Sequence, residues 1–204
     1  MLANSWAYLR RMQMSKESKE KEKLSLAKQQ QKTKPRIEDV LGELVTGDRL
    51  KNALDFVAYL RQNKLNPRWK STNAWVVKYK GKWLISIGIV PEESKPGSWH
   101  LGHWHMGDEF LDDFVNECEA SKSFEKYKEI IWSNLAYCKN CAKCNPGMNK
   151  TIFGKEFELL CYGFLAFNNP DIDALECAKK LLECKQKVIA KQKVIAANAQ
   201  SATK

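Results

Sequence analysis

The fold is decided by residues 75–89, which read WVVKYKGKWLISIGI. Apolar and aromatic side chains occupy every second position in two short runs, and a period of two predicts half-buried strands. The alternating positions are Trp75, Val77 and Tyr79 in the first run and Trp83, Ile85, Ile87 and Ile89 in the second. Lys80-Gly81 separates the runs, and a glycine there suits a tight turn. The stretch therefore predicts an antiparallel hairpin.

Helices are expected on both sides of this hairpin. Apolar residues recur at helical spacing over 37–44, 50–63, 107–118, 124–135 and from 170 onward, and further strands are expected over 98–106 and 157–167. The resulting order of elements is ααβββααβα. Strands that cluster in the sequence, with helices before and after them, predict an α+β fold with one antiparallel four-stranded sheet.

Three short motifs fit a known type of domain. They are the Asn66-Pro67-Arg68-Trp69 turn after a helix, the Tyr-Lys-Gly-Lys tip of the hairpin at 79–82, and a strand followed by a helix that starts at Pro170-Asp171. In this layout residues 38–183 resemble a group of uncharacterised bacterial α+β domains of unknown function, similar to the YdhG-like fold. The resemblance implies a fold and carries over no catalytic residue.

The positive charge is concentrated at the two ends of the chain. Of a formal net charge of +10, residues 1–36 contribute +7 and residues 178–204 contribute +6, whereas residues 37–177 carry −3. We expect a basic, unfolded or loosely helical tail over 1–36, a single domain over 37–184, and a basic helical extension over 185–204. Nucleic acid is not an expected partner of the domain, and non-specific binding through the tails stays open as an alternative.

The sequence gives no sign of a membrane partner. No apolar run approaches the about 20 residues that a membrane-spanning helix needs, and the first residues lack the apolar core of a signal peptide. The seven cysteines are an odd number, and disulfide frameworks belong mainly to secreted domains. Together these observations predict a cytoplasmic protein.

Four cysteines form a candidate metal site. Cys138, Cys141 and Cys144 are spaced as Cys-x-x-Cys-x-x-Cys, and Cys161 follows in the last expected strand. Four thiolates can hold a tetrahedral Zn²⁺, and closely spaced cysteines also suit an iron–sulfur cluster. Zinc is the favoured cofactor, and an iron–sulfur cluster, a redox-active pair and plain reduced thiols are the alternatives. The remaining cysteines are expected to pack between helices, and they are Cys118, Cys177 and Cys184.

The three histidines lie close together, at positions 100, 103 and 105. On an extended strand His103 and His105 share one face and His100 points to the other. A metal site made of all three therefore requires a bulge, which Gly102 would allow. Exposed histidines on an edge strand are the simpler expectation.

Tryptophan is concentrated on the predicted sheet, since four of the seven fall between residues 75 and 104. Aromatic side chains on one face either pack in the core or line a pocket for a flat or cationic ligand. In the second case the binding residues are Trp69, Trp75, Tyr79, Trp83, Trp99 and Trp104. We therefore expect a module that binds a small molecule or a protein, with a structural metal site. The alternative is a redox or metal-dependent enzyme that uses Cys138, Cys141 and Cys144.

Overall fold

The computed structural model describes residues 25–91, 97–102, 108–119, 124–139 and 147–202. The fold is α+β with antiparallel sheets, as predicted, but the expectation of a single four-stranded sheet is wrong. A five-stranded sheet has the order β1-β2-β3-β4-β8, and a separate three-stranded sheet has the order β5-β7-β6. The predicted fourth strand is β7, which belongs to the second sheet.

The helices are α2 (Ile37–Leu44), α3 (Gly47–Gln62), α4 (Asp108–Glu119), α5 (Phe124–Ser133) and α6 (Ile172–Ala202). The strands are β1 (Arg68–Ser71), β2 (Ala74–Tyr79), β3 (Lys82–Val90), β4 (Ser98–Gly102), β5 (Leu135–Tyr137), β6 (Met148–Ile152), β7 (Lys155–Leu165) and β8 (Phe167–Asn168). A further helical segment covers residues 25–33. None of the helices in the described ranges is long and apolar enough to cross a membrane.

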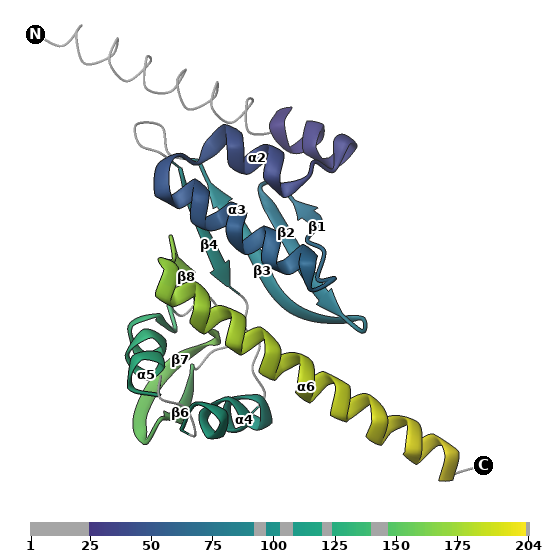
Figure 1. Cartoon of the computed structure of the whole chain (residues 1–204), viewed down its shortest axis with the longest axis vertical. Helices are drawn as coiled ribbons and strands as arrows, with labels where there is room; N and C mark the ends of the chain where they lie inside the picture. The colour runs from purple at the N-terminus through teal and green to yellow at the C-terminus, as the bar shows by residue number, and fades with distance from the viewer. Residues whose placement is uncertain (1–24, 92–96, 103–107, 120–123, 140–146, 203–204) are drawn as a thin grey trace, which may run out of the picture.

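The five-stranded sheet is covered by α2 and α3 on one face, which we call the helix-covered face (Figure 1). Four side chains that are partners across neighbouring strands form its centre, and they are Trp75, Ile87, Leu101 and Phe167. Each of them is at most 1% exposed. Trp99 lies on the same face, with its ring 6.3 Å from that of Phe56 on α3. This face is the main hydrophobic core.

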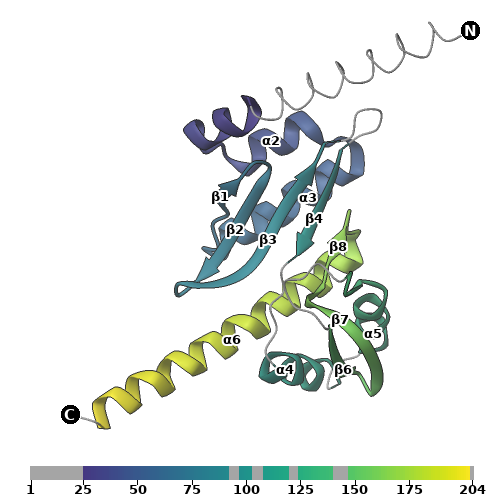
Figure 2. The ribbon, with the colours of Figure 1, turned by 180° about the vertical axis from the view of Figure 1, so that it is seen from behind.

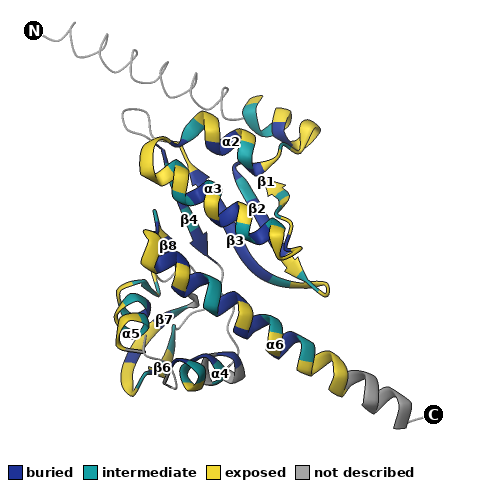
Figure 3. Ribbon diagram, viewed as in Figure 1, coloured by how far each residue is buried: buried dark blue, intermediate teal, exposed yellow. Residues whose placement is uncertain are grey.

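Helix α6 connects the two sheets. In Figures 1 and 2 it runs between the five-stranded sheet and a smaller lobe formed by α4, α5 and the three-stranded sheet. Its first half is buried on several sides, because it packs against α4 and α5 as well as against α3 and β3. Residues 191–195, in its second half, are exposed (Figure 3). The duplicated sequence Lys-Gln-Lys-Val-Ile-Ala at 185–196 lies within this single helix.

Part of the segment predicted as an N-terminal tail is helical and attached to the sheet. Gln30 is only 5% exposed. Its side-chain amide donates to Asn73 Oδ1 at 2.7 Å, and its Oε1 accepts from the backbone N–H of Asn73 at 2.8 Å. Asn73 occupies the turn between β1 and β2 with a positive φ of 53°. Two reciprocal hydrogen bonds therefore hold residues 25–33 against this turn.

Candidate functional site: the open face of the five-stranded sheet

The structure separates the six aromatic residues predicted to line one pocket. Trp75 and Trp99 are each 1% exposed, in the core of the helix-covered face. Trp69 is the strand partner of Trp75 and shares this face, where its indole N–H reaches Gln30 Oε1 at 3.5 Å. Tyr79 follows Trp75 and Val77 by alternation along β2. Most of these aromatic side chains therefore pack against helices, and Trp104 lies outside the described residues.

Trp83 lies on the opposite face of the sheet, and a bulge is the reason. Val77 pairs with Ile85, but Lys78 pairs with Trp83, so Leu84 has no partner on β2. An extra residue in one strand shifts the alternation of the residues beyond it. Trp83 therefore shares a face with Lys78. Simple alternation had predicted that it would share a face with Ile85 instead.

This second face, which we call the open face, is defined by the register of β1, β2 and β3. Val76 pairs with both Arg68 on β1 and Ser86 on β3, and paired side chains point to the same side of a sheet. Lys78, two residues after Val76, points the same way. Figure 2 shows this face toward the viewer, with none of the described helices in front of β1 and β2. Helix α6 crosses only its lower end.

Exposed cations surround Trp83. The ammonium group of Lys70 lies 3.9 Å from the centre of a Trp83 ring, which is a cation–π contact. Two further cations extend from the same face and two more from the hairpin tip, and they are Arg68, Lys78, Lys80 and Lys82. All five cationic side chains are exposed, and none forms an ion pair with a carboxylate in the part of the chain that the structure describes.

Two carboxylates on the helices are held by cations of a neighbouring helix. Glu117 on α4 accepts hydrogen bonds from Lys187 and Lys180 on α6, which lower the pKa of its carboxyl group to about 2. Arg61 on α3 holds Glu38 on α2 through two hydrogen bonds, and this contact likewise lowers the pKa of Glu38 to about 2. Both of these contacts join two helices, whereas the cations of the open face have no such carboxylate among the described residues.

The sequence contains a signal for this surface that the prediction missed. Between residues 56 and 91 there is no Asp or Glu, while the cations number seven: Arg61, Lys64, Arg68, Lys70, Lys78, Lys80 and Lys82. Averaging the charge over residues 37–177 hid this segregation, because acidic residues are numerous in α4 and in the segments that follow it.

His100 lies on the open face too, opposite Gly88 on β3. A Cβ built on Gly88 would lie 2.3 Å from Cε1 of the imidazole, so His100 occupies the space that a side chain at position 88 would need. Glycine is therefore required here for close packing and not for an unusual φ angle. His103 and His105 lie outside the described residues, so a site formed by the three histidines stays untested.

The described part of the cysteine loop shows how its ends are held. Cys138 donates its backbone N–H to the carbonyl of Leu159 on β7 at 2.6 Å. A Cβ built on Gly147 would lie 2.7 Å from the Cβ of Cys138 and 2.9 Å from the Cα of Leu159. The two ends of the loop, at Cys138 and Gly147, therefore meet beside β7. Cys161 lies two residues beyond Leu159, while Cys141 and Cys144 fall outside the described residues.

Cys118, Cys177 and Cys184 pack between α4 and α6, as predicted. All three are 0% exposed and are free thiols. Burial raises the pKa of Cys118 to about 11 and that of Cys184 to about 12, and it raises the pKa of Cys177 further. Thiols of this kind are poor nucleophiles and poor metal ligands at neutral pH. Within the described ranges no three His, Cys, Asp or Glu side chains are grouped so that they could hold a metal ion.

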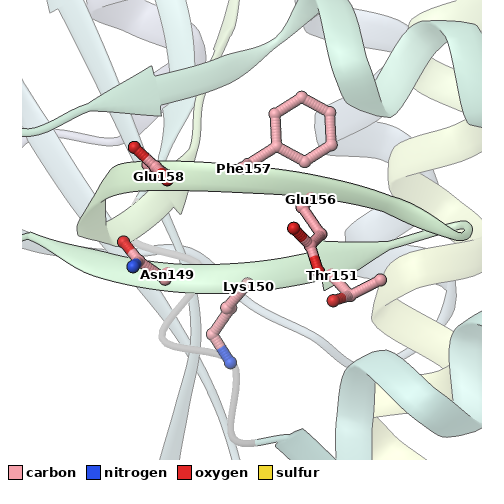
Figure 4. A pocket seen from close by; sticks show the side chains of 6 residues that line it. All are labelled: Asn149, Lys150, Thr151, Glu156, Phe157 and Glu158. Carbon is pink, nitrogen blue, oxygen red and sulfur yellow. The ribbon is translucent and has the colours of Figure 1, made fainter.

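A small hollow of about 250 Å³ lies in the β6–β7 hairpin (Figure 4). Its lining residues are Asn149, Lys150, Thr151, Glu156, Phe157 and Glu158. The register of the two strands shifts between Met148 and Lys150, next to this hollow. Lys150 and Phe157 point away from each other across the hairpin, and the glutamates are exposed. The hollow therefore lacks the buried polar groups that orient a bound ligand.

Lys185 is the one buried cation among the described lysines and arginines. It projects from α6 and is 7% exposed. Its Nζ donates to the carbonyl of Leu84, the residue left without a β2 partner by the bulge, at 2.8 Å. Burial lowers the pKa of the Lys185 amine to about 8. The contact attaches α6 to the five-stranded sheet.

Comparison of the chain with protein-family models, with curated proteins and with solved structures finds no match. The resemblance to YdhG-like domains therefore stays a prediction.

Proposed function

We propose that the chain is a binding module that takes an anionic ligand on the open face of its five-stranded sheet. The observation that carries this proposal is the group of three exposed cations on the open face, Arg68, Lys70 and Lys78, which have no carboxylate partners among the described residues. Like charges placed close together repel one another, so such a group lowers the stability of the free protein. A bound anion would relieve this repulsion.

The sheet suits this role because it fixes the positions of the cations. Neighbouring strands are about 4.8 Å apart, so Arg68, Lys70 and Lys78 come from adjacent strands of one face. Trp83 adds a flat, partly buried apolar surface beside these cations. The proposed ligand class therefore combines negative charge with a planar group.

Binding of inorganic polyphosphate tests the proposal for charge alone. We expect the full-length protein to bind it at low salt, and the variant K70Q/K78Q to bind at least about tenfold more weakly. The matched control is K51Q/K193Q, which removes two exposed cations from α3 and α6. Equal binding by the two double variants would contradict the proposal, since it would show that the open face contributes nothing.

We propose, as part of the same module, that Cys138, Cys141, Cys144 and Cys161 hold a structural Zn²⁺. The support is the contact between the two ends of the loop beside β7. The chain spans at most about 3.6 Å per residue, so Cys141 and Cys144 both stay within about 11 Å of the joined ends. A tetrahedral ion bound by four thiolates would attach the loop to β7 and stabilise the small sheet.

Elemental analysis of anaerobically purified protein tests this metal site. We expect about one zinc per chain, lost in Cys144→Ser and retained in Cys177→Ala, which alters a cysteine outside the loop. A brown colour together with bound iron would show that the loop holds an iron–sulfur cluster and not zinc. Protein free of metal would refute the site.

The second candidate function, a redox enzyme, makes a different prediction about the same cysteines. It requires an exposed thiolate with a low pKa in the loop. Rapid alkylation of Cys138, Cys141 or Cys144 in the native protein at neutral pH would favour the enzyme. Slow alkylation that accelerates after chelation of the metal would favour the structural site.

A further inference from the structure

We infer that the ligand of the open face is single-stranded nucleic acid, an inference that rests on the proposed binding function. The feature that points to it is the combination of Trp83 with cations placed around it on the same face. Proteins that bind single strands stack bases on aromatic side chains and hold the phosphates with a basic surface. Both components are present here, within a few ångströms of each other.

The contact between Lys70 and Trp83 suggests how a nucleotide would bind. In the free protein the Lys70 ammonium lies 3.9 Å from the centre of the ring and so occupies one side of the indole. Lys70 is exposed and has a long flexible side chain, so a base can displace it and stack on Trp83. The displaced ammonium would then lie close to the phosphate attached to that base. The free protein thus keeps the ring covered until a ligand replaces the cation.

The remaining cations fit the backbone of the same strand. Lys78 is the strand partner of Trp83 on the open face, and Arg68 extends from the same face opposite Val76. Lys80 and Lys82 at the hairpin tip lie toward Tyr79 on the other face, so they contribute only at the edge of this surface. No carboxylate belongs to the segment 56–91, so none of its own side chains repels a phosphate there. The small net charge of residues 37–177 is therefore compatible with a strongly basic local surface.

A single strand fits this surface better than a duplex. The bases of a duplex are stacked on one another and are not available to Trp83, whereas the bases of a single strand can turn outward. The open face is a sheet surface and carries no described helix over β1 and β2 that could enter a major groove. The aromatic component therefore selects unpaired bases, and the cations supply affinity without sequence preference.

Fluorescence anisotropy with a labelled single-stranded oligodeoxythymidylate separates the two components. We expect Trp83→Leu to weaken binding about fivefold to a hundredfold, because one stacked base is lost, and to leave the salt dependence unchanged. Trp83→Phe keeps an aromatic ring and should recover part of the affinity. K70Q/K78Q should instead reduce the slope of log K against log salt by about 1.4, as two phosphate contacts disappear.

The controls distinguish this inference from the proposed function on which it rests. Thermal melting shows whether each variant is folded, and K51Q/K193Q measures the effect of removing two charges elsewhere. Inorganic polyphosphate offers charge without bases, so its binding should respond to K70Q/K78Q and not to Trp83→Leu. Duplex DNA of the same length should bind more weakly than the single strand.

Three results would refute the nucleic-acid inference, and the third would also refute the proposed anion-binding function. If polyphosphate binding depends on Lys70 and Lys78 while the oligonucleotide ignores Trp83→Leu and Trp83→Phe, the anion-binding module stands and the nucleic-acid inference fails. Equal affinity for duplex and single-stranded DNA would also refute the stacking of bases on Trp83, while the anion-binding module would stand. If K70Q/K78Q and K51Q/K193Q bind both probes alike, the open face contributes no more than other exposed cations and both proposals fail.

Discussion

Replacement of Lys185 by methionine should change how the stability of the protein depends on pH. Lys185 is 7% exposed, and its Nζ donates to the carbonyl of Leu84. Burial lowers the pKa of its amine from the usual 10.5 to about 8. The folded state therefore releases this proton near pH 8, whereas the unfolded chain keeps it until about pH 10.5.

The sign and size of the effect follow from this difference. Below about pH 8 the amine is charged in both states, and burial of the charge costs the folded state free energy. Between pH 8 and 10.5 the unfolded state binds more protons, so the contribution of Lys185 to stability rises with pH. A pKa lowered from 10.5 to about 8 corresponds to roughly 3 kcal/mol over that interval.

Urea unfolding of the wild type and of Lys185→Met between pH 7 and 10.5 measures the effect. The quantity of interest is the difference in unfolding free energy between the two proteins, because other groups affect both alike. Tyr59, whose pKa burial raises to about 12, and Cys184, whose pKa rises to about 12, make both proteins less stable at alkaline pH. We expect the wild type to gain about 3 kcal/mol relative to the variant.

Lys193→Met is the matched control, because Lys193 is an exposed lysine on the same helix. Its difference from the wild type should stay constant over the same range of pH. A constant difference for Lys185→Met as well, or one that favours the variant as the pH rises, would refute the account of Lys185 as a buried amine.

Two further predictions concern stability. Gln30→Ala leaves Oδ1 and the backbone N–H of Asn73 without their partner, so it should lower the free energy of unfolding in urea by about 2 kcal/mol. Gln29→Ala, at an exposed position, should lower it by less than about 0.5 kcal/mol. Equal losses would show that residues 25–33 are not attached to the sheet. Glu38→Gln should lower the free energy of unfolding by about 1 kcal/mol at neutral pH. Because Arg61 lowers the pKa of Glu38 to about 2, this deficit should disappear as the pH falls from 4.5 toward 2. A deficit that persists at pH 2 would show that the pairing with Arg61 does not stabilise the charged carboxylate of Glu38.

Local patterns in the sequence were enough to predict the hairpin and the helices around it. The strands at 75–79 and 83–89 and the helix over 37–44 agree with β2, β3 and α2. Alternation and helical spacing are properties of single segments, so the sequence displays them directly. Strands β1, β5, β6 and β8 were missed because segments of two to five residues are too short to show a period.

The arrangement of the strands was not predictable in the same way. Which strands pair depends on tertiary contacts, so the segment from Lys155 to Leu165 was assigned to the wrong sheet. The bulge at Leu84 had a similar consequence for the candidate site. It moved Trp83 to the open face, away from the aromatic residues with which alternation had grouped it, and thereby placed it beside Lys70.

The most direct test of the central claim is to map which lysines a bound oligonucleotide protects. The full-length protein is labelled with an amine-reactive reagent, with and without single-stranded oligodeoxythymidylate, and the modification of each lysine is measured by mass spectrometry. Our account predicts protection of Lys70 and Lys78 and unchanged labelling of Lys51 on the far side of the sheet. Protection confined to lysines before residue 25 or after residue 185 would contradict it, since the ligand would then bind the ends of the chain and not the open face.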